Sequence, residues 1–145
     1  MDKTQGVQGS VTTDSEFVQL SIPARPELLS LPRMTAAAIA SQGGFDVEDV
    51  EDVRLAIEEL CLAAFEGRGP GRLYLHLGFR GSTLEVECTF EPEGDSAATP
   101  EPRGELATQL TEQLLSALTD SHGIDVVAGR PRAWFHKQHH DPPTE

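Results

Sequence analysis

The stretch EDVEDVRLAIEELCLAAFE, residues 48–66, decides the fold of this chain. Its apolar residues recur with the period of an α-helix, so the stretch predicts a helix with one face in a core. The residues on that face are Val50, Val53, Ile57, Leu60, Cys61 and Ala64. The opposite side is also apolar, and its members are Leu55, Ala56, Leu62 and Ala63, which surround Glu59. We therefore expect a helix that is covered on both faces.

Glu59 is the residue of this helix that is suited to chemistry. Apolar surroundings disfavour the ionised form of a carboxyl group, which is the usual preparation of a general base. The alternative is that the side chain extends past its small neighbours into solvent and has no functional role. The pattern of residues alone leaves both interpretations open.

The segments before this helix predict a strand and a second helix. Apolar and polar residues alternate over 16–22, as in a half-buried strand. Residues 26–41 have a helical composition, but Pro32 lies among them. Because a proline removes one backbone hydrogen bond and crowds the preceding turn, we expect a first turn ahead of Pro32 and the main helix from near it. Asp46 or Glu48 is expected to cap the central helix.

The segments after the central helix predict a hairpin, a loop, a third helix and short strands. Alternation over 73–90 indicates a hairpin with one buried face. Residues 91–103 are rich in proline and acidic residues and predict a mobile loop. Helical spacing returns over 104–119, and strands are expected near 124–127 and 132–137. The leucines expected to form the buried stripe of this third helix are Leu106, Leu110, Leu114 or Leu115, and Leu118.

This order of elements predicts an α+β two-layer sandwich, in which three helices cover one face of an antiparallel-rich mixed sheet. A chain of 145 residues suits one domain, which we place at 16–138. Residues 1–15 and 139–145 are polar and without periodicity, so we expect two disordered tails.

Charge and composition restrict the partners. The formal net charge is -13 and the pI is near 4.6, which argues against binding to nucleic acid or to an anionic membrane and favours a partner with a basic surface. The sequence shows no apolar stretch of membrane-spanning length and no signal-peptide pattern, so we expect a cytoplasmic protein. Cys61 and Cys88 are interpreted as buried free thiols of a reducing compartment, with a disulfide as the alternative.

Two runs carry a resemblance to a known family. LSIPARPELLSLPRMTAAAIASQGG, residues 20–44, and DVEDVEDVRLAIEELC, residues 46–61, resemble the amino-terminal half of the RsbW and SpoIIAB family of bacterial anti-sigma factors. The likeness is good over 16–66 and holds only in outline beyond. That family belongs to the GHKL superfamily of ATP-binding folds, so the resemblance implies a Bergerat-like fold.

The resemblance also implies roles for residues of the nucleotide pocket. Glu59 matches a glutamate that serves as general base in a serine kinase. Four residues later the family has an asparagine that chelates the magnesium of ATP, and here that position is Ala63, which cannot coordinate a cation. The family's D-x-G-x-G run is missing from residues 90–106, and of its G-x-G-L turn only Gly104 and Leu106 remain. We expect a degenerate pocket formed by Glu59, Ala63 and Gly104, with ATP and magnesium bound only if it still functions, and no other metal site.

By the same resemblance the protein is expected to sequester an alternative RNA polymerase sigma factor and to release it to a STAS-type anti-anti-sigma factor. A homodimer is expected as well. The implied partner surface comprises Arg25, Glu27, Leu28 and Arg33, with the loop before the central helix. Two alternatives remain: an active serine-protein kinase that phosphorylates a STAS partner with Glu59 as base, and an interaction module with the same fold in another regulatory pathway.

Overall fold

The computed structural model describes residues 16–94 and 104–139. The predicted tail at 1–15, most of the predicted loop at 91–103 and residues 140–145 therefore lie outside the described residues. The elements in chain order are β1 (Val18–Pro23), the 3-10 turn η2 (Pro26–Leu28), α2 (Ser30–Gln42), α3 (Val47–Phe65), β2 (Gly71–Arg80), β3 (Thr83–Pro92), α4 (Glu105–Leu118), β4 (Ser121–Val127) and β5 (Arg130–Gln138).

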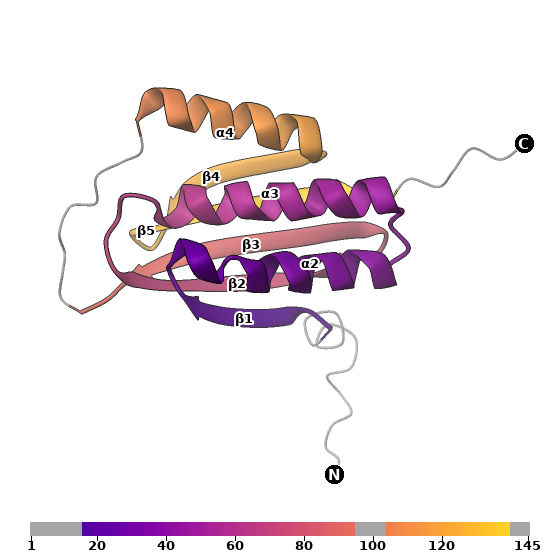
Figure 1. The fold of residues 1–145 in the computed structure, drawn as a ribbon, viewed down its shortest axis with the longest axis horizontal. Coiled ribbons are helices and arrows are strands. Elements are labelled where there is room, and N and C mark those ends of the chain that lie inside the picture. Colours follow the sequence, from indigo (N-terminus) through magenta and orange to yellow (C-terminus); the bar gives the residue numbers. More distant parts are fainter. Residues whose placement is uncertain (1–15, 95–103, 140–145) are drawn as a thin grey trace, which may run out of the picture.

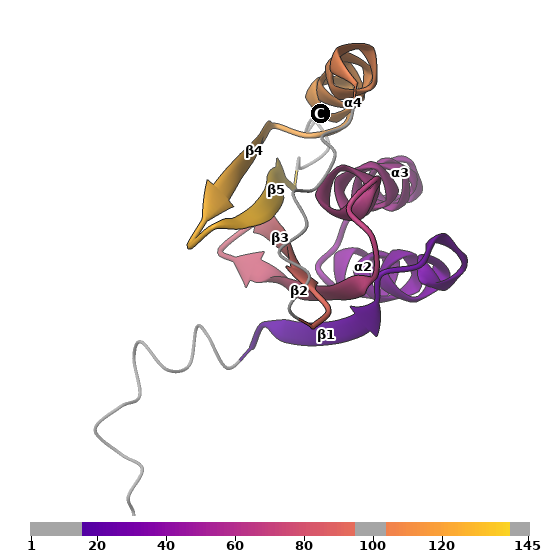
Figure 2. The ribbon, with the colours of Figure 1, turned by 90° about the vertical axis from the view of Figure 1, so that its left-hand side faces the viewer.

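The five strands form one sheet in the order β1-β2-β3-β5-β4, and the helices lie on one of its faces (Figures 1 and 2). The two-layer α+β prediction is thereby confirmed. Every strand pairing among the described residues is antiparallel, so the parallel component of a mixed sheet is not found there. The register places Leu75 between Leu20 of β1 and Cys88 of β3, and the buried apolar residues of β2, β3 and β5 share the face that the helices cover.

The central helix α3 forms the middle of the helical layer. It begins at Asp46, whose Oδ1 accepts a hydrogen bond from the backbone N–H of Asp49 at 2.8 Å. Its buried residues are Val53, Ala56, Ile57, Leu60, Cys61, Ala63, Ala64 and Phe65. The expectation of cover on both faces is only partly right, because Leu55 is 54% exposed. The helices α2 and α4 cover the flanks of α3 and leave its outward side open to solvent (Figure 2).

The helix α2 begins at Ser30, two residues before Pro32, in agreement with the expected start near this proline. Pro32 is the third residue of the helix, where the backbone N–H has no partner within the helix in any case, so the proline costs no hydrogen bond. The predicted stop is confirmed: the helix ends at Gln42, and Gly44 has a φ of 96°, a conformation that favours glycine.

The helix α4 is rotated relative to the prediction. Leu115 is fully buried and Leu118 packs against the core, as expected, whereas the exposed fractions of Leu106, Leu110 and Leu114 are 69%, 52% and 45%. Thr111 is buried in their place. The reason is that α4 lies at the end of the helical layer and packs on α3 and β4, so that one side of it alone is covered (Figure 2).

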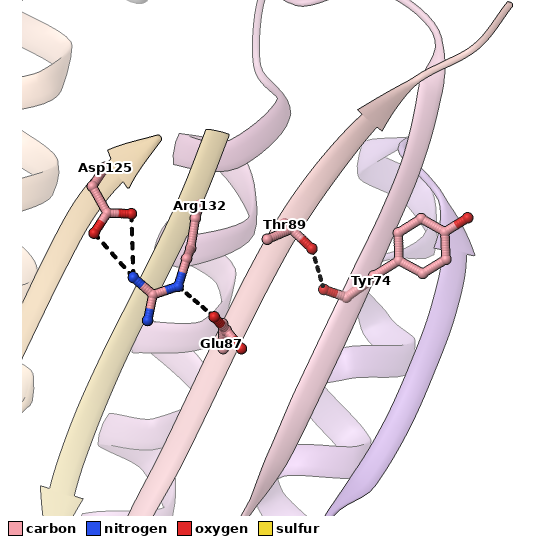
Figure 3. A network of polar contacts seen from close by, with 5 residues as sticks. All are labelled: Tyr74, Glu87, Thr89, Asp125 and Arg132. Carbon is pink, nitrogen blue, oxygen red and sulfur yellow. Dashed lines mark hydrogen bonds and ion pairs between the residues drawn. The ribbon is translucent and has the colours of Figure 1, made fainter. Parts of the chain in front are cut away.

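The edge strand β4 is tied to the rest of the sheet by charge. Arg132 of β5 donates hydrogen bonds to Glu87 of β3 and to both carboxylate oxygens of Asp125 of β4, at 3.0 and 3.2 Å for Asp125 (Figure 3). The bond to Glu87 is the main reason that the pKa of Arg132 is raised. This network lies on the sheet face opposite the helices, and it links three adjacent strands.

His139, which directly follows β5, makes contacts that the sequence did not indicate. The backbone N–H of His139 donates to the carbonyl oxygen of Ser82 at 2.9 Å, and its Nε2 lies 2.8 Å from the carbonyl oxygen of Gly44. The placement of His139 in a disordered tail is therefore wrong, since these contacts fix it beside the loop between α2 and α3.

Lys137 is a buried cation that joins three elements. Its Nζ donates to the carbonyl oxygen of Leu118 at the end of α4 at 2.9 Å and lies 3.8 Å from carboxylate oxygens of Asp49 and Asp52 at the start of α3. Its side chain is 9% exposed. A cation at the C-terminal end of a helix also interacts favourably with the helix dipole.

We predict that Lys137→Met lowers the free energy of unfolding by about 1–3 kcal/mol, because a helix carbonyl and two carboxylates lose their common partner. Urea denaturation measures the change. Arg130→Met is the matched control on the same strand, since Arg130 forms an ion pair with Glu91 in which both side chains are well exposed, and its effect should stay below about 1 kcal/mol. Equal effects of the two variants would contradict the role given to Lys137.

The two cysteines are free and fully buried, as predicted. The neighbouring Cys61 thiol and burial raise the pKa of Cys88 well above its ordinary value. The thiolate is therefore strongly disfavoured in the folded protein, and the thiolate is the reactive form.

We predict that a thiol reagent at neutral pH labels neither cysteine in the folded protein and labels both in urea. Mass spectrometry of the labelled protein after set times measures this. Rapid labelling of Cys88 under native conditions would show that the core opens at this point.

Candidate functional site

Glu59 lies at the contact between α3 and α4. Its side chain is half-buried, and its Oε1 accepts a hydrogen bond from the hydroxyl of Thr111 at 3.3 Å. Thr111 is 1% exposed, so this hydroxyl is directed into the interface between the two helices. The structure thus gives Glu59 a polar partner that the sequence pattern did not reveal, because Thr111 is distant along the chain.

Ala63, one helical turn after Glu59, is 4% exposed. Its methyl group is packed against its surroundings, as is expected for a core residue. A divalent cation needs oxygen ligands, and a methyl group offers none. The described residues also contain no group of three or more His, Cys, Asp or Glu side chains arranged to hold a metal ion.

Gly104 precedes the first residue of α4 and is exposed. A Cβ atom built on Gly104 would meet nothing within 4 Å, so the described surroundings do not require a glycine here. Glu105 follows in the first turn and brings a negative charge to the helix N-terminus, where an anion would otherwise be attracted. Seven residues separate Gly104 from Thr111, a rise of about 10 Å along the helix, so Gly104 does not join Glu59.

Glu59, Ala63 and Gly104 are not among the lining residues of four cavities that described residues line. A cavity of about 510 Å³ lies on the open face of the sheet, where its lining includes Tyr74, His76 and Thr89. The ring of Phe17 stacks on that of His76 with 4.7 Å between centroids. Alternation over 73–90 predicted one buried face for this hairpin and no cavity on the other, although the aromatic rings of Tyr74 and His76 on the polar side of β2 were a signal of it.

The residues assigned to a partner surface lie at one end of the helical layer. Arg25 and Glu27 are exposed around η2, and Leu28 is half-buried against the core. Arg33, in the first turns of α2, forms an ion pair with Glu58 of α3 at 3.3 Å. This pair joins Arg33 to the flank of α3 that faces α2, whereas the side chain of Glu59 lies on the flank that faces α4.

The loop before α3 lies elsewhere. It follows α2, whose 13 residues span about 20 Å, so the loop and η2 are at opposite ends of that helix (Figure 1). The structure therefore divides the predicted partner surface into two separate sites, of which Arg25, Glu27 and Leu28 form one.

Comparison with known proteins gives a consistent set of relatives. No family model matches the chain. The chain is 27% identical over 122 residues to a serine-protein kinase RsbW of Bacillus velezensis, covering 81% of this chain and 69% of the relative. The RsbW of Bacillus subtilis is 26% identical over 119 residues, with 79% and 68% covered. The RsbW of Listeria innocua is 32% identical over 83 residues, with 54% and 53% covered.

The fold of the chain agrees with what its similarity to the RsbW proteins leads us to expect. The aligned regions include most of the chain, and the α+β arrangement of three helices on a five-stranded antiparallel sheet is consistent with the GHKL-like fold expected from the resemblance. No helix among the described residues has the length and hydropathy needed to span a membrane. The chain is thus RsbW-like: it is similar to the RsbW serine-protein kinases over most of its length.

Proposed function

We propose that this protein is an anti-sigma factor that acts by binding: it holds an alternative sigma factor away from RNA polymerase and releases it when a STAS-type anti-anti-sigma factor competes. The observation that carries the proposal is the contact between α3 and α4. There the methyl group of Ala63 is buried at the expected metal-ligand position, and Glu59 is hydrogen-bonded to Thr111. Such a protein acts in the cytoplasm, and pairing into a homodimer is part of the proposal.

The residues present do not fit ATP and magnesium. The position of the metal ligand carries no oxygen, and the helix end suited to phosphate has Glu105 in its first turn. The carboxylate that would act as base lies against the hydroxyl of Thr111. These are separate positions of the chain, and each one alone weakens nucleotide handling.

The second candidate function is an active kinase, and the names of the relatives favour it, since they are serine-protein kinases. Glu59 is retained and half-buried, so a base remains at the family position. In that case Glu59 would accept the proton of the serine hydroxyl of a STAS partner while phosphate is transferred from ATP.

We predict that calorimetric titration with ATP and magnesium shows no binding in the low micromolar range, because the metal has no ligand at residue 63. Phosphate transfer from labelled ATP to candidate STAS proteins should be absent as well. Binding in the low micromolar range, or transfer that Glu59→Gln abolishes, would establish the kinase and contradict the degenerate pocket.

We predict that the protein co-purifies with one sigma factor and one STAS protein when each of those encoded in the source genome is tested. Arg25→Glu should weaken binding of its partners by about tenfold or more, since the charge of an exposed side chain in the contact is reversed. Arg80→Glu, on the opposite face of the sheet, is the control and should bind normally. Recovery of neither class of protein would refute the proposed function.

A further inference from the structure

The three exposed leucines of α4 form a continuous apolar line, which we name the leucine stripe: Leu106, Leu110 and Leu114. They are spaced by four residues, so they lie on one side of the helix over about 12 Å. Scattered exposed apolar residues are ordinary, but an aligned set on one helix face marks an interaction site. Neither the resemblance nor the partner surface at η2 accounts for it.

The neighbouring helix extends this apolar surface. The helices α3 and α4 run antiparallel (Figure 1), and Thr111 lies opposite Glu59. Leu55 precedes Glu59 by one turn and is 54% exposed, so it lies toward the end of α4 that carries Leu114. The apolar residues of the two helices thus flank the Glu59–Thr111 contact from both sides, in a form suited to an added helix.

Charge decides which kind of partner fits. The helix α3 contains six acidic residues and α4 two, whereas three basic side chains lie beside them: Arg54 of α3, Arg33 of α2 and Lys137 of β5. Glu105 and Glu112 lie on α4 itself, and Glu59 lies between the helices. A second copy would bring the same acidic side chains face to face, where like charges repel. A helix with basic residues beside an apolar face is complementary instead.

We infer that the leucine stripe binds a basic amphipathic helix of a protein partner. The leucines bury the apolar face of that helix, and its lysine or arginine side chains pair with the acidic residues of α3 and α4. The inference rests on the proposed protein-binding function, but it concerns a surface separate from Arg25 and Glu27 and does not depend on which sigma factor is held.

In the test, three synthetic peptides of 14 residues are each titrated with the protein of 145 residues. The first has leucine at helical spacing and lysine elsewhere, the second has glutamate in place of each lysine, and the third has the composition of the first with its leucines scattered around the helix. Fluorescence anisotropy of the labelled peptides measures the affinity, and amide chemical shifts of the protein locate the bound peptide.

We predict that the first peptide binds at least tenfold more tightly than the other two and shifts the resonances of α4. The double variant Leu106→Ser and Leu110→Ser should reduce its affinity about tenfold. Both side chains are more than half exposed, so the variant should keep its melting temperature. Leu31→Ser is the matched control, because Leu31 is a 43% exposed leucine of α2, and its affinity should be unchanged.

Several outcomes would overturn the inference. Equal binding of the third peptide, or unchanged affinity of the double variant, would show that charge alone attracts the peptide. A large fall in the melting temperature of the double variant would show that the chain covers the stripe itself. A change from dimer to monomer in sedimentation would assign the stripe to a second copy.

The experiments distinguish a failure of this inference from a failure of the proposed anti-sigma function. A sigma factor bound equally by the wild type and the double variant removes the inference and leaves the anti-sigma function. If the peptide binds at α4 but no sigma factor is recovered, the anti-sigma function is refuted and the leucine stripe remains a binding surface.

Discussion

The burial of α3 between the sheet and the other two helices is the constraint on which this structure depends. Ile57, Leu60 and Cys61 are removed from solvent completely, and burial of such an aliphatic side chain contributes about 1.5–3 kcal/mol. The neighbouring helices are then positioned by two adjacent residues of α3. Successive side chains of a helix are about 100° apart, so Glu58 pairs with Arg33 of α2 on one flank and Glu59 with Thr111 of α4 on the other.

The orientation of α4 follows from the second of these contacts. A half-buried carboxylate needs a hydrogen-bond donor, which a threonine hydroxyl supplies and a leucine does not. With Thr111 directed at Glu59, Leu115 turns into the core and the other leucines turn outward. The contact between Thr111 and Glu59 therefore accounts for the exposure of three leucines on the same helix.

Local periodicity predicted the elements of this fold well, because alternation and helical spacing are properties of neighbouring residues. The central helix was placed at 48–66 and occupies Val47–Phe65. Relations between distant residues were not accessible in this way: the rotation of α4 depends on Glu59, and the burial of Lys137 depends on the ends of two helices. For the same reason the sequence located Glu59 and Ala63 on one helix but gave no sign that α4 covers that region.

The distribution of charge separates the two faces of the molecule. On the open face of the sheet the arginines pair with carboxylates, as Arg132 does with Glu87 and Asp125 (Figure 3), so that face is close to neutral locally. On the helical layer Arg33, Arg54 and Lys137 also pair with carboxylates of α3, but α3 and α4 carry eight acidic residues, so a negative excess remains. At physiological ionic strength a charge acts over about 8 Å, which includes a helix docked on α4 but not the far side of the sheet. The helical face therefore repels another copy of itself and attracts a basic partner. The sheet face is close to neutral, so its charge favours neither an acidic nor a basic partner.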